Sequence, residues 1–134
     1  MIVLDASAGV LALLNDGDAR PLLATRTVAV PHLADSEVAS ALRAQVLRGQ
    51  ISAEDARAAL GRWAQLGLRR FAAVGLLERI WELRDNLTAY DATYVALAEA
   101  LDCELVTADA PAGPSPRADV RHHGRSTLSR VVGA

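Results

Sequence analysis

The chain opens with Met1-Ile2-Val3-Leu4-Asp5, an uninterrupted apolar run that ends in a carboxylate. This pattern is typical of a strand covered on both faces, because neither face of such a strand meets water. A second strand candidate, Glu104-Leu105-Val106-Thr107, is followed two positions later by Asp109. In open parallel sheets, ligands bind beyond the carboxyl ends of the strands. If these two strands are neighbours, Asp5 and Asp109 lie at the ligand-binding edge of the sheet.

The segments between these two runs alternate between short strands and helical patterns. This alternation predicts an α/β fold with a parallel sheet. Ser52 and the residues after it form a capping box that opens a helix, and Gly49 is well suited to end the helix before it. Further strands are expected at residues 27–30, 70–74 and 120–122, and helices at 8–14, 33–48, 53–66, 76–85, 90–101 and 125–132, with a proline-rich loop at 110–116.

The composition is that of one globular domain spanning residues 1–134. Apolar residues make up 51% of the chain and charged residues 22%, unlike disordered chains. A chain of this length folds without a disulfide or zinc staple, and its single cysteine cannot form an intramolecular disulfide. The first residues lack the features of a signal peptide, and no stretch of 18 apolar residues occurs. We therefore expect a protein of the reducing cytoplasm with no membrane partner.

The basic residues are all arginine. Together, 14 arginines and 16 acidic residues give a net charge of −2, which argues against a simple nucleic-acid coat protein. The absence of lysine excludes mechanisms that need one, such as those of a P-loop, a Schiff base or a phosphate-receiver domain.

Two further acids stand near the expected starts of helices. Glu37 lies in the first turns of the helix at 33–48, and Asp91 opens the helix at 90–101. Helices that start at or cross the same sheet edge would bring both acids to Asp5 and Asp109. Each acid alone also has an ordinary role. Asp5 could cap a helix, and Asp91 could be part of a capping box. Glu37 could be a solvated helix residue, and Asp109 could form a turn. The residues next to these acids in the chain are apolar, and a carboxylate beside a core is costly. Ordinary structural roles therefore explain all four acids together less well than each acid alone.

Four carboxylates in one place must take up protons or hold a cation. Two unit charges about 4 Å apart repel by roughly 4 kcal/mol at an effective dielectric constant near 20. A small domain has only about 5–15 kcal/mol of stability in total. The available ligands are all oxygens, which suit Mg²⁺ or Mn²⁺ better than zinc. Such an ion can bridge a phosphate and generate hydroxide, so the predicted substrate is a phosphodiester, meaning a nucleic acid.

The charge of the remaining surface fits such a substrate. Setting the four acids aside leaves 14 arginines against 12 acidic residues, a mildly basic balance. Arginines can position a nucleic-acid backbone without reading its sequence. The leading candidates for these contacts are Arg43, Arg117 and Arg121, within a wider set that also holds Arg69, Arg70, Arg84 and Arg125.

Four segments of the chain resemble the motifs of PIN-domain proteins of the VapC toxin type. In chain order they are IVLDASA at 2–8, PHLADSEVASALR at 31–43, LTAYDATYVALA at 87–98 and LVTAD at 105–109. Their order and spacing cover nearly the whole chain. The third motif is the most specific, and the first would be weak alone.

The resemblance implies a PIN fold, with three layers (α/β/α) around a central parallel sheet of four or five strands. It also implies Mg²⁺- or Mn²⁺-dependent endoribonuclease activity of a toxin, with the catalytic and metal-binding acids Asp5, Glu37, Asp91 and Asp109. Among these, Asp5 and Asp91 are the expected direct ligands, and Glu37 and Asp109 would hold metal or water. Ser7 and Thr107 are expected to support the site through hydrogen bonds.

The resemblance further implies a cognate antitoxin, with which the chain would form a hetero-oligomer, and a homodimer. One departure from the family pattern is the proline-rich loop at 110–116, where the family continues into a polar and helical segment. This loop puts the role of Asp109 in question.

The remaining notable side chains carry no predicted chemistry. The three histidines lack zinc-ligand spacing. Trp63 and Trp81 stand among apolar residues at helical spacing and are expected in the core or at a dimer contact.

Two other functions compete with the nuclease. A doubly wound phosphatase or phosphotransfer domain would share the edge carboxylate Asp5, but a haloacid-type phosphatase needs a second aspartate where Ser7 stands, and a receiver domain needs a lysine. A non-catalytic PIN-like module would use its acids only as helix caps and act through a protein partner. Metal binding distinguishes this module from the nuclease.

Overall fold

The computed structural model describes residues 1–15, 19–108 and 128–130, which form a five-stranded parallel sheet between helices. The strand order is β3-β2-β1-β4-β5. The strands are β1 (Ile2–Leu4), β2 (Val28–Pro31), β3 (Arg69–Phe71), β4 (Glu104–Thr107) and β5 (Leu128–Arg130). The helices are α1 (Ala6–Leu14), α2 (Ala19–Thr25), α3 (Leu33–Leu47), α4 (Ala53–Gln65), the 3₁₀ turn η1 (Val74–Leu76), α5 (Leu77–Glu82) and α6 (Ala89–Ala100).

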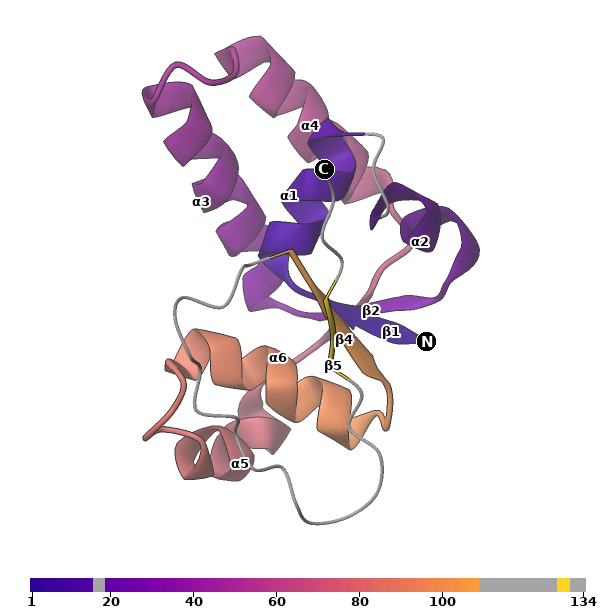
Figure 1. The fold of residues 1–134 in the computed structure, drawn as a ribbon, viewed down its shortest axis with the longest axis vertical. Coiled ribbons are helices and arrows are strands. Elements are labelled where there is room, and N and C mark those ends of the chain that lie inside the picture. Colours follow the sequence, from indigo (N-terminus) through magenta and orange to yellow (C-terminus); the bar gives the residue numbers. More distant parts are fainter. Residues whose placement is uncertain (16–18, 109–127, 131–134) are drawn as a thin grey trace.

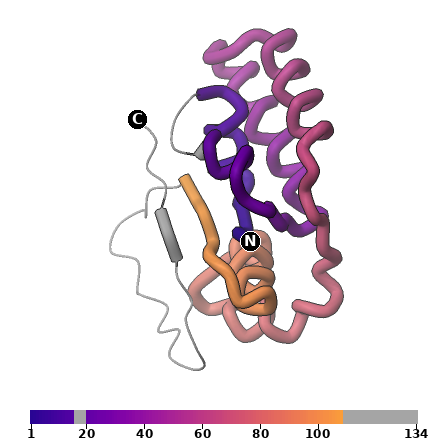
Figure 2. The backbone as a smooth tube through the Cα atoms, turned by 90° about the vertical axis from the view of Figure 1, so that its right-hand side faces the viewer, coloured from indigo at the N-terminus to yellow at the C-terminus, as the bar shows by residue number. Residues whose placement is uncertain are grey.

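The helices cover the two faces of the sheet in separate groups. Helices α1 to α4 lie on one face, whereas α5 and α6 lie on the other, and α6 packs against β1, β2 and β4 (Figure 1). The perpendicular view shows the same two groups on either side of the strands (Figure 2). The predicted α/β class, the three layers and the parallel sheet of four or five strands are therefore confirmed.

The central strand β1 forms the middle of the core. Ile2, Val3 and Leu4 are all fully buried, as expected for an apolar run without alternation. The neighbouring strands β2 and β4 run parallel to β1, with Val3 opposite both Ala29 and Leu105. The carboxyl ends of these strands therefore meet at one edge.

Local signals explain most helix boundaries. The Ser52 side chain accepts a hydrogen bond from the Asp55 amide at 3.0 Å, which confirms the predicted cap of α4. Gly49 has a φ of 71° just after α3, a conformation that glycine adopts without strain. Helix α1 begins two residues earlier than predicted, because Asp5 caps it through the Ala8 amide.

Helix α4 is fixed to the core through Trp63. This side chain is only 3% exposed, so the prediction of a core position is confirmed. A Cβ added at Gly9 of α1 would lie 2.8 Å from Cζ3 of the Trp63 ring, so α1 and α4 approach this closely only because residue 9 is glycine. Trp81 is 68% exposed on α5 and is not a core residue.

Several predicted elements differ from the structure. Helix α2 was not predicted, because its proline in the first turn resembles a loop signal although a helix tolerates proline there. The helix expected at 76–85 is shorter, with a 3₁₀ turn before it, and β3 ends at Phe71. The helix expected at 125–132 is wrong, since residues 128–130 pair as β5 with the open side of β4. The strand expected at 120–122 and the loop at 110–116 lie outside the described residues.

Within the part of the chain that the structure describes, no helix is long and apolar enough to cross a membrane.

Candidate functional site

The site begins at the carboxyl ends of two neighbouring strands, β1 and β4. Leu4 pairs with Val106, and the Asp5 amide donates a hydrogen bond of 3.1 Å to the Val106 carbonyl. The two strands are therefore neighbours, as the prediction of Asp5 at the ligand-binding edge required. Asp109 lies outside the described residues.

Asp5 holds its position through one of its two carboxylate oxygens. Its Oδ1 accepts hydrogen bonds from the Ala8 amide at 3.0 Å and from the Ser7 hydroxyl at 2.6 Å. Both hydrogen bonds that the described residues give to this carboxylate reach Oδ1. Asp5 is thus a helix cap, as its ordinary role predicts, and it caps α1 through Oδ1.

Ser7 links this carboxylate to the end of β4. Its hydroxyl donates to Asp5 and accepts a hydrogen bond of 3.1 Å from the Ala108 amide. The Thr107 hydroxyl lies 3.4 Å from the Ser7 hydroxyl. The structure therefore places Ser7 against Asp5 and Thr107 against Ser7, and these contacts hold the β1–α1 turn against the end of β4.

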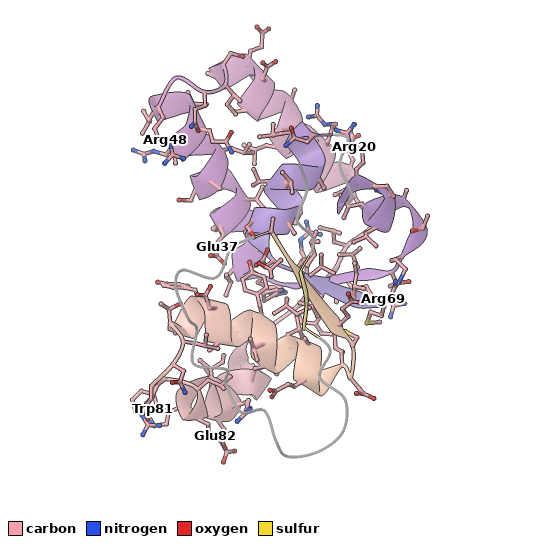
Figure 3. All side chains as sticks on the ribbon, viewed as in Figure 1. Arg20, Glu37, Arg48, Arg69, Trp81 and Glu82 are labelled. Carbon is pink, nitrogen blue, oxygen red and sulfur yellow. The ribbon has the colours of Figure 1, made fainter. Side chains whose placement is uncertain are left out.

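Glu37 reaches the site from α3 and meets Tyr94 of α6. The Tyr94 hydroxyl donates a hydrogen bond of 2.8 Å to Glu37 Oε1. Burial of the ring, followed by the Glu37 carboxylate and then the charge of Asp5, raises the pKa of Tyr94. Glu37 and Asp5, 32 positions apart in the chain, therefore both act on one phenol. Figure 3 shows Glu37 where α3 comes close to α6.

Asp91 stands at the exposed first turn of α6. Its amide donates a hydrogen bond of 3.2 Å to the Thr88 side chain, so the predicted cap at this helix start is present. Asp91 precedes Tyr94 by three positions, which puts the two side chains on one face of the helix, one turn apart. Across residues 1–15, 19–108 and 128–130, no group of three or more His, Cys, Asp or Glu side chains is arranged to hold a metal ion.

Of the three leading candidates for contacts with the nucleic-acid backbone, Arg43 is the one that the structure describes. It is exposed on α3, six positions after Glu37. Arg117 and Arg121 lie outside the described residues. In the wider set, Arg70 is paired with Asp35 and Arg84 stacks on the ring of Trp81 at 4.8 Å.

Asp35, two positions before Glu37 on α3, has a structural role. Arg70 donates through Nε to Asp35 Oδ2 at 2.9 Å and through Nη2 to Oδ1 at 3.0 Å, and Trp63 Nε1 donates to the same Oδ1 at 2.8 Å. Chiefly through Arg70, these donors lower the pKa of Asp35. The contacts join α3 to α4 and β3, so Asp35 fixes the helix that carries Glu37.

Sequence reasoning did not single out Tyr94 or Asp35. Both stand inside the quoted motifs, three positions after Asp91 and two before Glu37. Spacing shows that Tyr94 shares a helix face with Asp91, which was the available signal. Nothing in the spacing shows that its hydroxyl reaches α3.

Comparisons with known proteins identify the family of the chain. Residues 2–111 match the PIN domain family. Over 109 residues the chain is 61% identical to VapC ribonuclease Mb0985 of Mycobacterium bovis, an alignment that covers 81% of this chain and 86% of that protein. The chain belongs to the VapC ribonucleases. The predicted family, and the endoribonuclease class of toxin–antitoxin systems that it implies, are therefore confirmed.

Solved structures show the same fold. The crystal structure of PAE2754 from Pyrobaculum aerophilum matches this VapC chain with a TM-score of 0.65 and 27% identity, covering 81% of this chain and 74% of that one. VapBC2 from Rickettsia felis, solved bound to a DNA fragment from its promoter, matches with a TM-score of 0.59 and 18% identity, covering 81% and 88%.

Proposed function

We propose that this VapC chain hydrolyses RNA phosphodiester bonds with a Mg²⁺ or Mn²⁺ ion held by Asp5, Glu37, Asp91 and Asp109. The observation that carries the proposal is that Glu37 of α3 accepts a hydrogen bond from the buried Tyr94 hydroxyl of α6, the helix that also carries Asp91. Carboxylates that a fold brings together repel one another, and a cation relieves the repulsion. All the donors are oxygens, which fits Mg²⁺ or Mn²⁺.

The residues of the site have separate tasks in this proposal. Asp5, with Oδ1 occupied by the helix cap, offers Oδ2 as a ligand, and Ser7 keeps that carboxylate in place. Asp91 enters from α6 and is the second direct ligand, while Glu37 and Asp109 hold the ion or its water. When bound, the ion polarises the scissile phosphate and makes an attacking water more acidic. Arg43 contacts the RNA backbone, with Arg117 and Arg121 as the other proposed contacts.

The test compares acid variants for RNA cleavage in the presence of Mg²⁺. Asp5→Asn and Asp91→Asn are expected to abolish cleavage while the circular dichroism spectrum stays that of the wild type. If Asp91→Asn cleaves RNA at the wild-type rate, its role as a ligand is wrong.

A specific observation favours one alternative, a PIN-like module without catalysis. The Asp5 carboxylate caps α1, so this acid already has a structural role that needs no metal ion. Calorimetry with Mn²⁺ separates the two functions. An isotherm that is lost in Asp5→Ala supports the nuclease, whereas no binding at millimolar Mn²⁺ supports the module. The phosphatase or phosphotransfer alternative does not fit a VapC ribonuclease.

We further propose the partners that the family implies. The chain would bind a cognate antitoxin, which the similarity to the VapBC2 assembly supports. It would also form a homodimer and, with the antitoxin, a hetero-oligomer. Residues 1–134 would act as one PIN domain on cytoplasmic RNA. Light scattering of the chain alone and with its antitoxin measures these assemblies.

A further inference from the structure

Tyr94 is a buried polar side chain that is hydrogen-bonded to Glu37, one of the four proposed site acids. The residue is only 3% exposed, and its hydroxyl donates to Glu37 Oε1 at 2.8 Å. The ring belongs to the same buried cluster as Leu4 of β1 and Ala6 and Ala8 of α1. One phenol therefore joins α6, to which it belongs, to α3 through Glu37.

This arrangement restricts how the Glu37 carboxylate can turn. A glutamate side chain has several rotatable bonds, and a hydrogen bond to a donor fixed in the core selects one orientation of its carboxylate. Because the ring of Tyr94 is packed in the core, its hydroxyl cannot follow Glu37 to another position.

The same helix carries one of the proposed ligands. Asp91 lies one turn before Tyr94 on α6, so a single rigid element sets both the position of Asp91 and the orientation of Glu37. Movement of α6 relative to α3 would disturb two acids at once.

We propose that Tyr94 is a positioning residue of the metal site, whose hydroxyl aims the Glu37 carboxylate of α3 toward the edge that holds Asp5. This inference rests on the proposed function. It assigns Tyr94 no contact with RNA or with the reacting atoms. Its effect on the ion passes through Glu37.

The first experiment observes Tyr94 in a protein whose proposed site is intact. The chain has two tyrosines, and Tyr90 is 65% exposed on the same helix, so Tyr90→Phe leaves Tyr94 as the sole tyrosine. With tyrosine labelled with ¹³C at Cζ, this variant gives one NMR resonance. Addition of Mg²⁺ is expected to shift that resonance to saturation. A resonance that stays unchanged while calorimetry shows Mg²⁺ binding would overturn the inference.

The second experiment removes the hydroxyl. Tyr94→Phe keeps the ring in the core and is expected to weaken Mn²⁺ binding by 10-fold or more, within the roughly 10–100-fold range for groups that orient metal ligands. Tyr90→Phe is the matched control and keeps the wild-type affinity. Wild-type affinity in Tyr94→Phe would refute the role of Tyr94.

A double-variant comparison tests the route through Glu37. If Tyr94 acts through Glu37, adding Tyr94→Phe to Glu37→Gln causes little further loss of Mn²⁺ affinity, because the two effects are not additive. A full further loss of 10-fold or more would show another route and overturn the inference. If the wild type binds no Mn²⁺, the proposed function itself fails, and the inference fails with it. If the wild type binds and Tyr94→Phe binds equally, only the inference fails.

Discussion

Replacement of Gly9 by alanine tests how closely α1 and α4 are packed. The new Cβ would lie 2.8 Å from Cζ3 and 3.3 Å from Cη2 of Trp63, and 3.7 Å from Cδ2 of Leu4. The first of these distances is shorter than real carbon contacts allow, so something must move. The indole cannot move easily, since it is 3% exposed and its Nε1 donates to Asp35.

Two opposing effects set the magnitude. Alanine in place of glycine inside a helix stabilises by about 0.8–1 kcal/mol. Overpacking a well-filled core costs roughly 1–3 kcal/mol. The expected net result for Gly9→Ala is a loss of about 1 kcal/mol in the free energy of unfolding, which corresponds to a fall of roughly 4 °C in the melting temperature.

Gly61 provides the matched control. It lies inside α4, and a Cβ added there meets nothing within 4 Å in the described structure. Gly61→Ala should therefore gain about 0.5–1 kcal/mol from helix propensity alone. Urea unfolding of the two variants and the wild type measures both changes. If Gly9→Ala is as stabilising as Gly61→Ala, the close packing of Trp63 against α1 is wrong.

Three further predictions concern the site and its supports. Asp91→Asn should lower the rate of RNA cleavage at least 100-fold. The control is Asp55→Asn, which lies at the matching position of α4, three residues after its cap, and should cleave RNA at the wild-type rate. Both variants should lose a similar small amount of stability, about 0.3–1 kcal/mol, and equal cleavage by both would contradict the role of Asp91. Ser7→Ala removes the hydroxyl that donates to the Asp5 carboxylate and accepts from the Ala108 amide. We therefore expect a loss of about 1–3 kcal/mol in the free energy of unfolding, measured with urea, and about 10-fold weaker Mn²⁺ binding, measured by calorimetry. Because the pKa of Asp35 is lowered in the folded state, the stability it contributes is complete above its unfolded pKa and is lost as the pH falls through the lower folded value. Arg70→Met should therefore flatten the acid limb of stability against pH and cost less than about 1 kcal/mol at pH 7, since this ion pair is partly exposed; an unchanged acid limb would show that the pair does not set this pKa.

Patterns within a few residues of one another predicted much of the fold. The caps at Ser52 and Thr88 and the glycine at 49 set helix boundaries through hydrogen bonds or backbone freedom that involve only their neighbours. The strand at residues 104–107 was predicted with the same limits that the structure shows. Such elements are predictable because their causes lie inside the segment.

The element at residues 128–130 shows where this reasoning fails. Part of a segment for which a helix was expected forms a strand, because the edge of β4 offers backbone donors and acceptors for pairing. That edge exists only after the sheet has formed, so tertiary pairing overrides the local preference.

The amino-acid sequence by itself determined which acids could form a site and which chemistry their oxygens suit, because charge and residue type are carried by each residue alone. Only the tertiary structure decided how those acids are held. Tyr94 meets Glu37 across 57 positions of sequence, and Asp35 meets Trp63 and Arg70 across 28 and 35 positions. These contacts depend on how α3, α4, α6 and β3 pack around one core, and no periodicity within a segment encodes that packing.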